Sequence, residues 1–142
     1  MSTEYPEPIR YTGHLIRRAE QRHVAAWQTH SPDATNVQFA ALAVIARRPG
    51  ASQRELGDEL DLDRSTIADL VRRLEHNGLI TRTASTVDRR RFELEVTDAG
   101  RAEIERLRPI ALRIEQELFG DMTPDELAAF RRFLQTMLRP RA

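Results

Sequence analysis

The chain contains no cysteine, so it can form neither a disulfide framework nor a site that needs thiolate ligands. This excludes iron–sulfur clusters, cysteine-ligated zinc and cysteine-based redox sensing. It also contains no lysine, because every one of its 22 basic residues is arginine. No hydrophobic run approaches a length of about 18 residues, and residues 1–10 lack the apolar core of a secretion signal. We therefore expect a soluble, cytoplasmic protein.

Phosphate-binding glycine loops and nucleophile–base pairs are also missing. The 6 glycines are scattered, and the serines lie at predicted helix caps and loops. The 22 acidic residues balance the arginines, so the formal net charge is zero and does not identify a partner. The 142 residues are enough for one domain with its own core. We expect a protein that is not an enzyme and needs no cofactor.

The middle of the chain has the pattern of a helix-turn-helix. Ser52 and Glu55 form a capping box that opens a short helix over about 52–59. Asp63 can cap the next helix, whose apolar residues Ile67, Leu70, Val71 and Leu74 share one face and which ends at Asn77-Gly78. Two helices joined by about three residues, the second polar on its outer face, predict this motif.

The apolar period then changes from 3.6 to 2, which predicts strands at 79–82 and 92–96. The polar loop 83–91 joins them, and its tip, residues 87–91, is the densest basic run of the chain. A helix-turn-helix followed by a hairpin with a basic tip predicts a winged helix. The expected fold is therefore mainly α-helical with a small β-hairpin wing.

Long helices with apolar stripes are predicted on both sides of this core. One covers about 11–30, a second opens at Thr35, a third covers about 98–119, and the last opens at the strong cap Thr123-Pro124. Pro109 predicts a kink in the third, unless it stands at a helix start. Because the terminal helices cannot cover both of their faces, we expect a homodimer. The expected domains are 1–34 and 98–142 for dimerisation and 35–97 for DNA binding.

These segments resemble the MarR family of bacterial winged-helix regulators over roughly residues 9–139. Residues 88–97, DRRRFELEVT, match the family's wing signature D-x-R-x-x-x-L-x-[LV]-T, and supporting matches lie at 53–57, 63–67 and 74–82. The resemblance implies a homodimer whose two winged lobes bind a pseudo-palindromic operator. It also implies a repressor released by a small aromatic ligand. Residues 11–27 resemble a subgroup associated with aromatic-acid catabolism and acyl-CoA thioester effectors.

The expected DNA contacts follow from this arrangement. Arg90 occupies the wing-tip position, where a guanidinium can enter a narrow minor groove, and Asp88 either orients it or holds the turn. The start of the first helix, the amino-terminal and outer positions of the second, and the rest of the wing complete the expected set. It comprises Gln53, Arg54, Arg64, Ser65, Thr66, Asp69, Arg72, Asp88, Arg89, Arg90 and Arg91. The alternatives are a solvated charged hairpin and, for Ser65 and Thr66, simple helix capping.

Candidate ligand residues lie on the first two helices. Their mixture of aromatic, imidazole and guanidinium groups suits a planar acid or a CoA phosphate, and they comprise His14, Arg17, Arg18, Arg22, His23, Trp27, Phe39 and Leu42. The alternative is that His23 and Trp27 are ordinary core or interface residues. No metal site is predicted, since the histidine spacings lack an i,i+4 pair.

Two other functions remain open at this point. A winged helix can mediate protein–protein contacts, its basic tip meeting an acidic partner, because a fold does not dictate its function. A DNA-binding regulator can also work without any ligand. The first alternative predicts no sequence-specific DNA binding, whereas the second predicts DNA binding that no small molecule alters.

Overall fold

The computed structural model describes residues 5–140, which form six helices and one hairpin. None of the helices in this range combines the length and the apolar character needed to cross a membrane. In chain order the elements are α1 (Thr12–His30), α2 (Asn36–Arg47), α3 (Gln53–Leu60), α4 (Arg64–His76), β1 (Ile80–Ala84), β2 (Phe92–Val96), α5 (Asp98–Phe119) and α6 (Pro124–Met137). The predicted winged helix with flanking terminal helices is confirmed.

Side-chain caps begin five of the helices where the sequence predicts them. Thr35, Ser52, Asp63, Thr97 and Thr123 each accept a hydrogen bond from a backbone N–H in the first turn. Three of these caps are complete capping boxes, in which a glutamine or glutamate side chain accepts from the cap residue's own N–H. The caps satisfy donors that the first turn of a helix would otherwise leave unpaired.

The wing is an antiparallel pair whose register runs from Ile80 opposite Val96 to Ala84 opposite Phe92. The first strand therefore begins and ends later than predicted, and Thr83 and Ala84 belong to the sheet rather than to the loop. The reason is the pairing partner, because β2 extends far enough to hold these two residues. A further bridge joins β2 to the segment before α3, where Gly50 donates to Leu94 and Leu94 donates to Ala51, at 3.0 and 2.9 Å.

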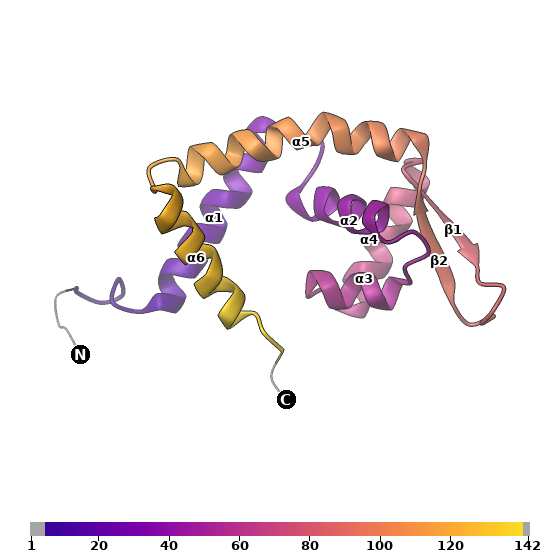
Figure 1. Ribbon diagram of the computed structural model, residues 1–142, viewed down its shortest axis with the longest axis horizontal. Helices are drawn as coiled ribbons and strands as arrows, with labels where there is room; N and C mark the ends of the chain where they lie inside the picture. Colours follow the sequence, from indigo (N-terminus) through magenta and orange to yellow (C-terminus); the bar gives the residue numbers. More distant parts are fainter. Residues whose placement is uncertain (1–4, 141–142) are drawn as a thin grey trace.

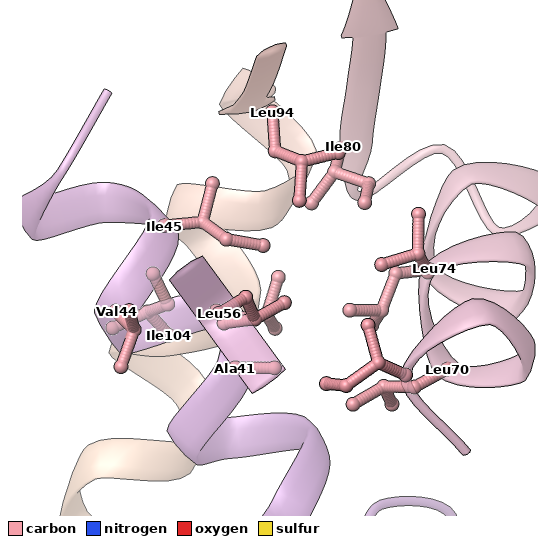
Figure 2. Close-up of a cluster of buried hydrophobic side chains, with 12 residues drawn as sticks. Ala41, Val44, Ile45, Leu56, Leu70, Leu74, Ile80, Leu94 and Ile104 are labelled. Atoms are coloured by element: carbon pink, nitrogen blue, oxygen red, sulfur yellow. The ribbon is translucent and has the colours of Figure 1, made fainter. Parts of the chain in front are cut away.

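One apolar core holds the winged lobe together. Side chains of α2, α3, α4, the two strands and α5 meet in it, as Figure 2 shows for Ile45, Leu56, Leu74 and their neighbours. Leu56, Leu74 and Leu94 are completely buried. The polar ends of α3 and α4 are thereby left outside the core.

A second, smaller cluster lies where α1 meets α5 and contains Ala26, Trp27, Leu107 and Ile114. The helix α5 contributes to both clusters and links the winged lobe to the terminal helices (Figure 1). It continues through Pro109 as one helix of 22 residues, so Pro109 does not stand at a helix start. Its ring leaves one carbonyl without a helical N–H partner.

The terminal helices leave much apolar surface uncovered. The helix α6 contributes no buried residue, and its only aromatic ring contact within residues 5–140 joins Phe130 to Phe119, with centroids 6.0 Å apart. Phe133 and Leu112 are each 64% exposed. Figure 1 shows α1 and α6 at the end of α5 that lies away from the wing.

Candidate nucleic-acid interface

An open groove of about 790 Å3 lies between the start of α3, the start of α4 and the wing. It brings together six of the eleven predicted DNA contacts, namely Gln53, Arg54, Arg64, Asp88, Arg90 and Arg91. These residues come from three segments that are separated in sequence, so tertiary folding concentrates their charge. First-turn residues of both α3 and α4 line the groove, and the partial positive charge of a helix amino end favours an anion.

Four arginines of this region carry charge that no carboxylate neutralises. Arg54, Arg64, Arg89 and Arg90 are exposed, and none of them forms an ion pair with a carboxylate of residues 5–140. Guanidinium groups suit phosphates and guanine edges because their donors form a rigid planar fork. The groove can therefore bind a polyanion although the chain as a whole is neutral.

Short-range hydrogen bonds hold the tip of the wing. The Asp88 carboxylate accepts from the Arg90 N–H at 3.0 Å, so of its two suggested roles it holds the turn. The buried Ser85 hydroxyl accepts from the N–H groups of Val87 and Asp88, at 3.1 and 3.2 Å. Sequence analysis missed Ser85, although a serine just before a turn can bond the backbone two residues on. These bonds give Arg90 a fixed base from which to extend.

The first turn of α4 is both capped and exposed. Asp63 accepts from the Thr66 N–H at 2.8 Å and from the Ser65 hydroxyl at 3.0 Å. These bonds stabilise its charged form and lower the pKa of Asp63. Ser65 thus has a local partner, but it donates to the cap residue Asp63 and does not cap the helix itself. Farther along the same helix, Arg72 pairs with Asp69, and both side chains are exposed.

Arg82 is a residue of the groove that sequence analysis did not select. Its guanidinium carbon lies 4.7 Å from the centre of the Phe92 ring, and it donates to the Gln53 side chain at 3.5 Å. A carboxylate oxygen of Glu75 lies 3.9 Å away. Every second residue of a strand lies on the same face, and this period of two is the sequence signal that could have identified Arg82.

The predicted ligand residues separate into two groups. Trp27 is buried, donates to His23 at 3.2 Å and packs against Phe39 with ring centroids 5.9 Å apart. Arg17, Arg18 and Arg22 instead lie exposed on α1. The structure therefore brings the aromatic candidates together but leaves the basic ones on the surface.

A cavity of about 250 Å3 lies between α2, the end of α4 and α5. Of the predicted ligand residues only Leu42 lines it, beside Gln38, Asn77 and Leu107. Gln38 also completes the capping box of α2, and Asn77 caps the end of α4.

Asp33 and Glu103 also line this cavity, and both pair with Arg106. The Ser31 hydroxyl and then the Arg106 cation lower the pKa of Asp33. The cavity thus combines an apolar floor with amides and charged groups, a mixture typical of small-molecule sites.

Comparisons with known proteins agree with this geometry. The model of the MarR family matches residues 34–92. The transcriptional regulator HosA of Escherichia coli is 30% identical over 125 residues, which cover 88% of this chain and 93% of HosA.

Two solved structures extend the likeness to nearly the whole chain. BpsR of Bordetella bronchiseptica, whose DNA binding is described as regulated by 6-hydroxynicotinic acid, is 30% identical with a TM-score of 0.90, covering 96% of this chain and 99% of BpsR. The transcriptional repressor CouR, bound to a 23-mer DNA duplex, is 29% identical with a TM-score of 0.88, covering 98% of this chain and all of CouR.

Proposed function

The chain belongs to the MarR family of transcriptional regulators, and on that premise we propose that it represses transcription as a homodimer on a pseudo-palindromic operator. In this proposal residues 35–97 form the DNA-binding lobe, and residues 1–34 and 98–142 form the dimer region. Residues 1–4 and 141–142 of that region lie outside the described residues.

The observation that carries the proposal is the groove with its unpaired arginines. Arg64, Ser65 and Thr66 on the first turn of α4 contact base edges or phosphates in the major groove, together with Asp69 and Arg72 farther along the same helix. Gln53 and Arg54 hold a phosphate at the start of α3, which positions the protein without reading sequence. Arg90 enters the minor groove beside it, with Arg89 toward phosphate or solvent. A few such contacts in each lobe give an affinity that falls steeply with salt.

Dimerisation is supported by the apolar side chains that the terminal helices leave uncovered. They come from all three helices of the region and comprise Tyr11 just before α1, Leu15 of α1, Leu112 of α5, and Phe133 and Met137 of α6, each at least 44% exposed. A second copy related by a two-fold axis buries them and presents two α4 helices to successive major grooves, about 34 Å apart.

We propose that a small aromatic acid or its CoA thioester releases the DNA. The regulation of BpsR by 6-hydroxynicotinic acid and the two candidate regions beside α5 support this class. Because α5 joins both core clusters, a ligand held beside it can change the spacing of the lobes. Release requires that the ligand favour the mismatched spacing by roughly 1–3 kcal/mol.

The test is a gel-shift of the purified protein on DNA flanking its own gene, repeated with aromatic acids and their CoA thioesters. We expect a specific shift that one ligand class abolishes. A specific shift that no ligand alters would replace the effector proposal with a ligand-independent regulator. No shift even at low salt would favour a module for protein–protein contacts.

A further inference from the structure

The Glu55 carboxylate is contacted by polar groups of Ser52, Arg48 and Arg91, through hydrogen bonds from the first two and an ion pair with the third. Glu55 is the N3 residue of α3, where one carboxylate oxygen accepts from the N–H and the hydroxyl of Ser52, at 3.4 and 3.0 Å. The other oxygen accepts from Arg48, at the end of α2, at 2.6 Å. Arg91, at the base of the wing, pairs with the first oxygen. The same guanidinium nitrogen of Arg91 lies 3.3 Å from the carbonyl oxygen of Gly50.

These contacts attach the wing at a second point. The first is the pair of backbone hydrogen bonds between Leu94 and the Gly50-Ala51 segment. Arg91 lies three residues nearer the tip than Leu94, so its pair with Glu55 adds to that bridge and to the Arg82–Gln53 hydrogen bond in restraining the hairpin. Beyond Arg91, at the tip of the hairpin, lie Arg90 and the turn that Asp88 holds. The angle of the wing is thus set against the start of α3.

The charges at this point are closely balanced. The Ser52 hydroxyl, and then the Arg91 and Arg48 cations, lower the pKa of Glu55, so the carboxylate is ionised at neutral pH. The Arg91 guanidinium is paired with this carboxylate, whereas Arg54, Arg64 and Arg90 form no ion pair within the part of the chain that the structure describes. Although Arg91 borders the groove, its charge is already matched by a carboxylate.

We propose that Glu55 and Arg91 form an anchor that sets the angle of the wing and thereby positions Arg90 for DNA, without contacting DNA themselves. Glu55 is then a positioning residue for the DNA-binding function proposed above, on which this inference rests. The proposal differs from the sequence-based expectation that Arg91 contacts DNA directly.

Glu55→Gln separates the anchor from simple electrostatics, because the two predict opposite signs. Glutamine at N3 keeps a capping box, as Gln38 does in α2, so α3 still begins correctly. The substitution removes a negative charge beside the DNA, and Coulomb attraction alone would therefore tighten binding. Loss of the anchor instead weakens it by about tenfold.

Glu59→Gln is the matched control. Glu59 lies on the same helix and pairs with Arg47 and with Arg48, but it does not touch the wing. The variant removes the same charge, and we expect DNA binding that is unchanged or slightly tighter. Thermal unfolding by circular dichroism checks that both variants fold.

Arg91→Gln gives a second, independent measurement. If Arg91 serves only as an anchor, this variant weakens binding but leaves the slope of log Kd against log salt concentration unchanged. Arg90→Ala, by comparison, reduces that slope by about 1 for each lobe bound. The double variant Glu55→Gln/Arg91→Gln should bind no more weakly than either single variant, because both break the same contact.

The duplexes are one from the DNA flanking its own gene and one of mixed sequence and equal length. Binding by Glu55→Gln as tight as by Glu59→Gln overturns the anchor, as does a slope that falls by about 1 in Arg91→Gln. In both cases the wild-type protein still binds, and the proposed function stands. If the wild-type protein binds neither duplex, the proposed function fails and the anchor's role in DNA binding fails with it.

Discussion

Phe133→Asp tests whether the exposed face of α6 is the dimer contact. The Phe133 side chain is 64% exposed, and its one cation contact within residues 5–140 is the neighbouring Arg132, whose guanidinium carbon lies 5.2 Å from the ring centre. Because α6 contributes no buried residue, the substitution does not disturb the core of a single copy. It changes only what a second copy would cover.

The expected magnitude follows from the area that pairing removes from water. A phenylalanine buries about 200 Å2 in all, and with 64% of it exposed here, about 130 Å2 remain for the partner. At about 25 cal/mol per Å2 this area stabilises the dimer by about 3 kcal/mol per copy, and by about 6 kcal/mol for two symmetric copies. This is an upper bound, so we expect dimer dissociation to become easier by a factor of about 100 to 10,000.

Sedimentation velocity across a wide range of concentrations measures this change directly. Val87→Asp is the control, since Val87 is 94% exposed but lies at the wing tip, and this variant should sediment as wild type. Phe133→Asp should become monomeric with an unchanged circular dichroism spectrum. A Phe133→Asp protein that sediments as the wild-type dimer would refute the assignment of α6 to the interface.

Three further predictions concern the wing, the backbone and pH. Arg90→Ala should weaken operator binding at least about tenfold in a gel-shift while sedimentation still gives a dimer, and normal binding would remove the wing tip from the mechanism. Gly100→Ala should lower the free energy of unfolding by about 2–4 kcal/mol, because the added carbon would lie 2.1 Å from the Leu79 carbonyl oxygen. Gly13→Ala, with no atom within 4 Å, should instead raise it by about 0.5–1 kcal/mol in urea titrations. Stability should also fall as acid protonates Glu55 and Asp63. Their pKa values are lowered in the folded protein, so their contribution is present above the ordinary values of 4.5 and 3.8 and is lost as pH falls through the folded ones. A urea midpoint that already declines well above these values would contradict this account.

The helix starts and the general form of the lobe could be read from sequence because their causes are local. Thr35, Ser52 and Asp63 each accept a hydrogen bond from the backbone N–H three residues on, so each cap involves only four consecutive residues. The buried face of α4 is likewise set by spacing along one helix. In contrast, the limits of β1 depend on how far β2 extends opposite it, and the prediction there was displaced.

The candidate site was predictable only in part. Residue type and the wing motif sufficed to select Arg90 and Arg64, which both line the groove. The stacking of Arg82 on Phe92 and the ion pair of Arg91 with Glu55 could not be predicted in this way. The first contact depends on the register of the hairpin, and the second joins residues far apart in the chain, so local spacing does not specify the partner in either case.

Local pattern thus accounts for the helices, their caps, the wing and the basic character of its tip, because hydrogen bonding and apolar period act over a few residues. Only the folded chain decides which arginines carry free charge. Arg90 and Arg91 are adjacent in sequence and chemically identical, yet among residues 5–140 only Arg91 has a carboxylate partner. The difference arises because packing of the lobe brings Glu55, from a distant helix, within reach of only one of them.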